Sequence, residues 1–255
     1  MKRCLPIVVL FVILLFGSAC QDRATVSGDA TDTVTADSAS SNASPASGQE
    51  ALEAEEQAIT PEGYDILADA WGDLDKDGED EHVVVYETNE TIEGVRQREL
   101  RVLKVFDGEW RVFHIASGPV LTSADGGALG DPFESVSVER GCIVLRHFGG
   151  SRIKWNYTHR FRYQEDSWRL IGATSVVGAP CDYQEQVDYN LSTGKIHYSK
   201  ETEVCDEQFE VVDRQQETDT FDRPFDALPE MQGFSPGGTQ VTIWITEDTD
   251  VSFYY

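Results

Sequence analysis

Hydrophobic and polar positions alternate with a period of two over much of the chain after residue 60, and this period predicts β-strands. Residues 81–86 are rich in β-branched and aromatic side chains, and residues 100–106 and 110–115 form two further alternating runs. Asp107-Gly108 stands between those two runs, and an Asp-Gly pair in this position is typical of a tight hairpin.

The remaining alternating runs extend the same pattern toward the C-terminus. They cover residues 135–138, 142–148, 152–163, 168–173 and 241–245. No long run places apolar residues at helical spacing. The sequence therefore predicts a mainly β fold of antiparallel hairpins in chain order, since hairpins need no crossover connection. We expect a meander that forms either a sandwich or a partial, propeller-like assembly of sheets.

The first twenty residues have the pattern of an export signal. A positive start, Met1–Arg3, precedes the apolar run 5–16 and the small residues Gly17-Ser18-Ala19. The apolar run is shorter than the ~20 residues that span a bilayer. Cys20 follows directly, which indicates a bacterial lipoprotein signal, cut before a cysteine that then carries lipid. A plain secretory signal is the alternative, because Gly17 stands where such signals usually have an aliphatic residue.

We expect three segments: a signal peptide at 1–20, an acidic Ser/Thr/Ala linker at 21–60 and a β-rich domain at 61–255. Residues 21–49 have no aromatic residue and few aliphatic ones, so they cannot bury enough apolar surface to fold. Lipid on Cys20 would anchor the chain to the membrane. Gln21 replaces the aspartate that usually retains lipoproteins at the inner membrane, which favours the outer membrane of the cell envelope.

The chain is strongly acidic, with 46 Asp and Glu residues against 20 Lys and Arg residues and a net charge of −26. Loss of Lys2 and Arg3 with the signal gives −26 − 2 = −28. Nucleic acid is excluded as a partner, because its phosphates need Lys and Arg. Bound cations, a basic protein or an envelope polymer fit better, although solubility alone also explains such a charge.

Three cysteines remain after the signal and the lipidated residue. If residues 192–194 form a three-residue hairpin loop, Leu191 faces Lys195, and Cys181 then faces Cys205 on the same hairpin. An exported compartment permits the bond. We therefore predict a Cys181–Cys205 disulfide that leaves Cys142 as a buried thiol. The alternative is three reduced cysteines in the core.

An acidic stretch, Gly72–Gly78, carries the clearest chemical signal. Asp73, Asp75 and Asp77 alternate before a glycine that allows a sharp turn, as in calcium loops of the D-x-D-x-D-G type. Glu79 would add its backbone carbonyl and Glu81 a second carboxylate. Calcium prefers such a shell of hard oxygens.

The loop differs from an EF-hand. Position twelve, which needs a bidentate glutamate, is Val84, and the flanking residues 64–71 and 82–87 are strand-like. We predict a structural calcium loop on a β-hairpin that binds Ca²⁺ weakly, at ~10⁻⁴–10⁻³ M. A solvated acidic turn and another hard cation are the alternatives, because Asp and Gly are also ordinary turn residues.

The loop and its Val-rich strand resemble the calcium loops of the VCBS and FG-GAP repeat families, although only one copy is present. The order of motifs from Pro61 to Ala173 is closer to bacterial exported lipoproteins, mostly uncharacterised, that carry a single loop of this kind. The segments that carry the resemblance are Pro61–Tyr64, Gly126–Phe133, His147–Ser151 and Trp168–Ala173. The resemblance implies a calcium-bearing β domain in the envelope and no reaction.

No catalytic motif stands out. His147 precedes two glycines and a serine, but there is no G-x-S-x-G elbow or HExxH pair. Trp155, Tyr157, Phe161 and Tyr163 share one strand face, which indicates core, with a sugar- or peptide-binding row as the alternative. We expect a non-enzymatic protein with a binding or envelope-maintenance role. The alternative is a hydrolase of envelope polymers that uses a carboxylate pair.

Overall fold

The computed structural model describes residues 59–244 and 250–255, which belong to one compact unit of the chain, Ser44–Tyr255. All its named elements are strands, so the predicted mainly β class is confirmed. The predicted signal 1–20, with Cys20, and nearly all of the linker 21–60 lie outside the described residues. The strands are β1 (Asp65–Gly72), β2 (Glu81–Ile92), β3 (Val95–Phe106), β4 (Glu109–Ser117), β5 (Phe133–Val138), β6 (Ile143–Gly150), β7 (Lys154–Gln164), β8 (Ser167–Ala179), β9 (Tyr183–Asn190), β10 (Lys195–Cys205), β11 (Val211–Asp222), β12 (Gln240–Trp244) and β13 (Asp250–Tyr254).

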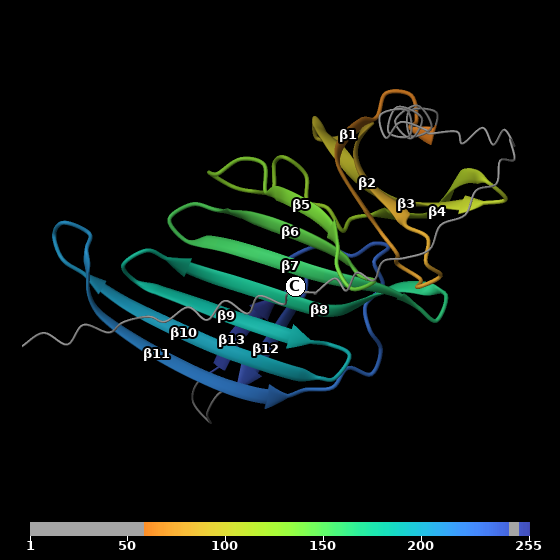
Figure 1. The fold of residues 1–255 in the computed structure, drawn as a ribbon. Helices are drawn as coiled ribbons and strands as arrows, with labels where there is room; N and C mark the ends of the chain where they lie inside the picture. The colour runs from red at the N-terminus through yellow and green to blue at the C-terminus, as the bar shows by residue number, and fades with distance from the viewer. Residues whose placement is uncertain (1–58, 245–249) are drawn as a thin grey trace, which may run out of the picture. The chain divides into compact units, whose positions relative to one another are not determined.

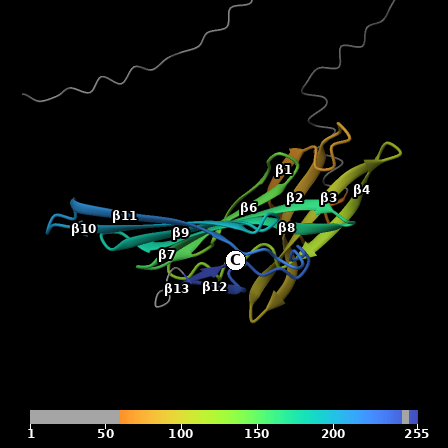
Figure 2. The ribbon, with the colours of Figure 1, turned by 90° about the horizontal axis from the view of Figure 1, so that it is seen from below.

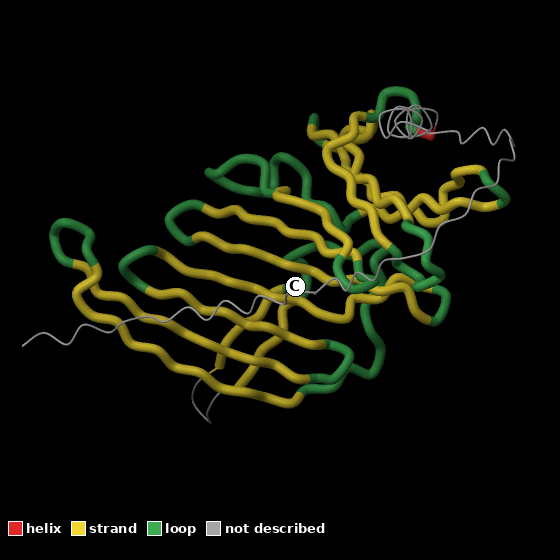
Figure 3. The backbone as a smooth tube through the Cα atoms, in the orientation of Figure 1, coloured by secondary structure: helices red, strands yellow, loops and turns green. Residues whose placement is uncertain are grey.

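The strands form two antiparallel meanders and a hairpin (Figure 1). β1 to β4 make a four-stranded sheet, and β5 to β11 make a seven-stranded sheet, each in chain order. Every strand in these sheets pairs only with its neighbours in sequence, and mostly short loops join them (Figure 3). The C-terminal hairpin β12–β13 lies on one face of the seven-stranded sheet (Figure 2), where Phe253 contacts Tyr189.

One apolar core joins all three sheets. The covered face of the seven-stranded sheet contributes Phe161 and Leu145, the four-stranded sheet contributes Val85 and Leu100, and the C-terminal hairpin contributes Phe253. All five side chains are almost fully buried. Because side chains alternate along a strand, the residues directly before and after Phe161 on β7 point to the opposite face of the sheet.

The hairpin turns follow the sequence signals. Asp107 and Gly108 have φ angles of 56° and 80° between β3 and β4, and Arg140 and Gly141 have 55° and 73° between β5 and β6. Positive φ at both central residues is the type I′ turn, whose twist matches that of the paired strands. The predicted Asp-Gly hairpin is therefore confirmed.

The predicted Cys181–Cys205 disulfide is present, but the register used to predict it is wrong by one residue. Asn190, rather than Leu191, pairs with Lys195, so the loop between β9 and β10 has one residue more than expected. Gly194 does take the left-handed conformation, with φ of 78°. Cys181 lies before β9 with φ of 60°, and this bend brings its Cα within 5.2 Å of that of Cys205. Cys142 is a free, buried thiol, as predicted.

Loss of this disulfide should lower the free energy of unfolding by about 2–4 kcal/mol, because the bond closes a long loop in the unfolded chain. Urea unfolding of the Cys181→Ala/Cys205→Ala variant measures the effect. Addition of a reductant to the wild type should lower the urea midpoint in the same way as the double substitution. Cys142→Ala is the matched control, and its midpoint should fall with reductant as that of the wild type does. The prediction would be contradicted if neither reductant nor the double substitution changed the midpoint.

Candidate metal centre

The acidic loop connects β1 to β2 and is fixed at its start. Leu74 is 4% exposed and belongs to the main core, so it anchors the loop from inside. Gly72 lies so close to Val138 of β5 that a Cβ at this position would come within 2.6 Å of that side chain. The loop is therefore held between its own hairpin and the first strand of the neighbouring sheet.

Carboxylates inside the loop accept hydrogen bonds from its own backbone. The amide of Gly78 donates to Asp73 Oδ2 at 3.1 Å, and the amide of Glu79 donates to Asp77 Oδ1 at 2.9 Å. The amide of Leu74 donates to Glu81 Oε2 at 2.8 Å. Lys76 and Gly78 have positive φ, which provides the sharp turn that the D-x-D-x-D-G pattern requires.

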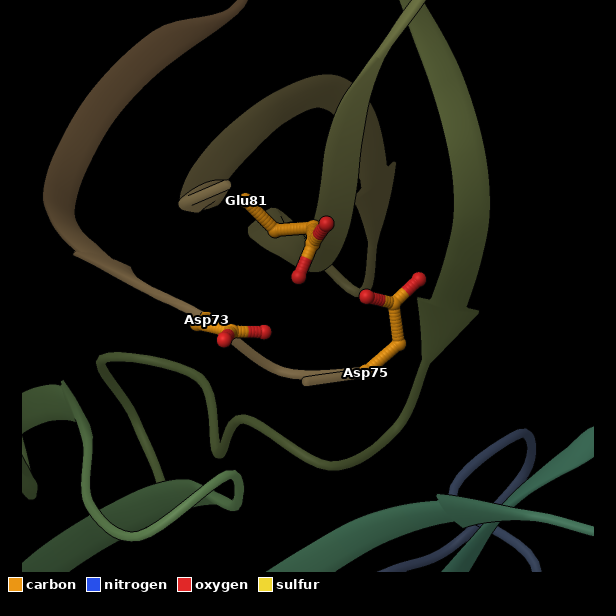
Figure 4. A group of neighbouring side chains, drawn as sticks. All are labelled: Asp73, Asp75 and Glu81. Carbon is orange, nitrogen blue, oxygen red and sulfur yellow. The ribbon is translucent and has the colours of Figure 1, made fainter. Parts of the chain in front are cut away.

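Three of the predicted ligands converge. Asp73, Asp75 and Glu81 each offer a carboxylate oxygen, and these oxygens lie within 4.8 Å of one another (Figure 4). Glu81 is almost fully buried, whereas Asp75 is exposed. Such an acidic triad could hold a metal ion. Asp77 and Glu79 are not part of this group. Asp77 accepts hydrogen bonds from Lys104 and from the Glu79 amide, and the ligand predicted from Glu79 is its backbone carbonyl rather than its carboxylate.

The ammonium of Lys104 already bridges the loop. This side chain comes from β3 and donates to Asp75 at 2.5 Å, to Asp77 at 2.7 Å and to Glu81 at 2.9 Å. Lys104 is 14% exposed, so it contacts the carboxylates in a partly desolvated place. The loop therefore directs its oxygens at a cation, and the cation it contacts is supplied by the protein.

The charges stabilise one another. Burial alone would lower the pKa of Lys104, but hydrogen bonds to Asp75, Asp77 and Glu81 raise it well above its usual range. The hydrogen bond from Lys104 in turn lowers the pKa of Asp77. Lys104 is therefore an ammonium at any working pH, and it competes with a metal ion for these oxygens.

Sequence reasoning missed Lys104, and a β-bulge explains why. The turn at Glu93-Gly94 pairs Thr91 with Arg96, and continuing this register would pair Glu81 with Phe106, the last residue of β3. A bulge shifts the pairing by two residues, so that His82 pairs with Leu103. Glu81 then reaches Lys104, which no local pattern in the sequence indicates.

The histidine singled out from the sequence is inaccessible. His147 is fully buried, and its Nε2 accepts a hydrogen bond from the backbone amide of Leu121. Burial and the nearby Arg98 guanidinium lower the pKa of His147 to about 4.

The aromatic row on β7 lies partly in the core. Phe161 is buried as a core residue, whereas Trp155 and Tyr157 stack on each other at the half-buried end of the same face.

The disulfide indicates an oxidising compartment outside the cytoplasm, because cytosolic thiols are kept reduced. Within the described residues, no helix has the length and apolar character to cross a membrane. No protein family, curated protein or solved structure matches the chain.

Proposed function

We propose that the chain is a lipid-anchored, non-enzymatic binding protein of the bacterial cell envelope whose acidic loop holds a structural Ca²⁺. The observation that carries the metal site is the convergence of Asp73, Asp75 and Glu81. Asp77 lies close enough to share a cation with two of them, because it contacts the same Lys104 ammonium. Three converging carboxylates with a fourth beside them suit a hard, oxygen-binding ion.

Lys104 gives the proposed site a built-in competitor. A Ca²⁺ ion would take the carboxylates with two charges where the ammonium offers one, and Lys104 would turn toward solvent. Only the molecules whose carboxylates are free of the ammonium can bind Ca²⁺, so the apparent affinity for Ca²⁺ is the intrinsic affinity multiplied by the fraction of such molecules. This agrees with the weak affinity that the missing twelfth-position ligand predicts.

Thermal unfolding of the full chain with Ca²⁺ and with chelator tests the site. At ~1 mM Ca²⁺ and a Kd of ~10⁻⁴ M the ion adds about 1.4 kcal/mol to stability. The midpoint of the wild type should rise with Ca²⁺, and that of Asp75→Ala should not. Lys104→Met should respond more strongly than the wild type, because the competing ammonium is gone.

Asp213→Ala, at an exposed position on β11, is the control for a change of charge alone, and it should respond as the wild type does. If Ca²⁺ changes the thermal midpoint of neither the wild type nor Lys104→Met, the carboxylates do not bind Ca²⁺ even without the competing ammonium, and the calcium proposal fails. Equal responses of Asp75→Ala and the wild type would place the ion elsewhere.

The binding role is supported by charge. An excess of 26 acidic over basic residues favours a basic protein as partner, by steering its approach. Anchoring through Cys20 would hold the domain at the membrane surface, in keeping with a disulfide-permitting compartment. The burial of His147 supports a role without catalysis, since a general base must reach its substrate.

A further inference from the structure

An unusual cationic groove lies on the seven-stranded sheet. Phe161 of β7 points into the core, so Arg160 and Arg162 on either side of it point to the opposite face. They line a surface groove of about 480 Å³ between β7, β8 and the turn that joins β9 to β10. The residues that matter for recognition are Arg160, Arg162, Gly172, Asp188, Ser192 and Thr193.

Arg162 has no carboxylate partner among the described residues, although the chain has more than twice as many acidic as basic residues. Its Nε is closed off from solvent and has no hydrogen-bond acceptor within the described structure. An anion in the groove could not reach this atom, so the observation that matters is the missing carboxylate partner. The positive charge of Arg162 lies at the groove and no carboxylate of the described residues neutralises it through an ion pair.

Arg160 is only partly neutralised. Its Nη1 donates to Thr174 Oγ1 at 3.0 Å, and the Asp188 carboxylate is 4.0 Å away. Asp188 instead accepts a 2.7 Å hydrogen bond from the Thr174 hydroxyl. Among the residues that line the groove, the two arginines outnumber the one carboxylate, Asp188. Glu139, outside the lining, is also close enough for Arg160 to lower its pKa, although its main partner is Arg146. The lining therefore has a net positive charge in a strongly negative protein.

The rest of the lining suits a small oxyanion. Ser192 and Thr193 are exposed at the turn after β9, and Ser192 brings a hydroxyl group to the rim. The Thr193 hydroxyl already donates to the Asn190 carbonyl at 3.5 Å. Gly172 leaves the floor without a side chain beside the Arg160 methylenes. The planar guanidinium fork matches the oxygens of phosphate and binds them through two parallel hydrogen bonds.

We propose that this groove binds a phosphate group, held by Arg162 and Arg160 with the Ser192 hydroxyl of the β9–β10 turn as a further donor. The group belongs either to free phosphate or to a phosphate ester such as a lipid headgroup or an envelope polymer. The proposal is independent of the calcium loop, which lies on the other sheet.

Calorimetric titration of the full chain with inorganic phosphate and with glycerol 3-phosphate, at constant ionic strength, tests the proposal. Arg162→Gln should weaken binding about tenfold or more, because it removes a charge-assisted hydrogen bond. Asp188→Asn should strengthen binding, because it removes the competing carboxylate. Arg111→Gln, at an exposed site on β4, is the matched control and should bind as the wild type does.

Tighter binding of glycerol 3-phosphate than of phosphate would assign the groove to esters, and the reverse would assign it to the free ion. No heat of binding from either probe would overturn the proposal, as would equal affinity of Arg162→Gln and the wild type. The opposite responses of Arg162→Gln and Asp188→Asn also separate loss of the site from loss of the fold.

Discussion

Acidification from pH 6.5 to pH 4 is expected to remove much of the stability of the domain, because two buried histidines resist protonation. His147 and His159 are fully buried, and neither ring nitrogen of His159 has a hydrogen-bond partner in the described structure. Burial, which is the largest cause for both, lowers the pKa of His147 to about 4 and that of His159 to about 3.

The sign follows from the folded pKa values lying below the unfolded value of ~6.5. Stability is fully present above pH 6.5 and is lost as the pH falls toward the folded pKa values, since the unfolded chain takes up the protons first. At pH 4 each histidine costs on the order of 3 kcal/mol, which together approach the whole stability of a typical domain.

Urea unfolding at a series of pH values measures this loss. The ring centres of His159 and Phe234 are 4.9 Å apart, and the His159→Phe variant keeps a ring at this contact. This variant should lose less of its free energy of unfolding between pH 6.5 and 4 than the wild type does. His197→Phe, at an exposed position on β10, should leave it unchanged. Carboxylates with lowered pKa, such as Asp131 beside Arg98, act mainly below pH 4. A flat profile from pH 6.5 to 4 in the wild type would refute the expectation.

The second large effect is expected from Arg98→Met, at about 3–5 kcal/mol of lost stability. Arg98 has a side chain only 1% exposed and makes a bidentate contact to Asp131, with distances of 2.8 and 2.5 Å. It also donates to the Leu121 carbonyl at 2.8 Å and lies 3.5 Å from Glu87. Its removal leaves the largely buried Glu87 carboxylate, the half-exposed Asp131 carboxylate and the Leu121 carbonyl without their cation.

Arg96→Met provides a matched comparison two residues away on β3. Arg96 contacts the Asp65 and Glu87 carboxylates and donates to the Thr88 and Glu87 carbonyls at 2.7 and 3.0 Å, but its side chain is 33% exposed. Its loss should therefore cost less than that of Arg98, about 1–2 kcal/mol, because water can reach the groups that it leaves. The double variant Arg98→Met/Asp131→Asn should recover part of the stability, since one unpaired charge disappears. Equal losses for Arg96→Met and Arg98→Met in urea unfolding would show that burial of the ion pair is irrelevant.

The sequence predicted those parts of the fold that local chemistry determines. The Asp107-Gly108 turn and the alternating strands around it needed no distant information. β11 was not predicted, because almost every residue from Val211 to Asp222 is exposed and no apolar face marks it as a strand. This segment is a strand because it pairs with β10, and the local sequence of the segment gives no sign of that pairing.

The candidate sites show the same division. The carboxylates of the acidic loop are close in sequence, so their convergence could be predicted from spacing. Lys104 and the Arg160–Arg162 groove depend on strand register and on bulges, which shift partners by one or two residues. The disulfide was predicted despite a register error because the left-handed Cys181 bridges the one-residue difference.

The meander topology has a consequence for the order in which the chain folds. When the chain becomes available from its N-terminus onward, each strand appears after the strand before it, which is its only earlier partner in the sheet. Short-range pairing of this kind folds quickly and leaves few unpaired edges waiting for a late segment. Cys181 and Cys205 meet at the end of one hairpin, whereas Cys142 lies earlier in the chain, just before β6. Oxidation after β10 has paired with β9 therefore joins the native cysteines. The β12–β13 hairpin comes last and closes the core over a sheet that has already formed.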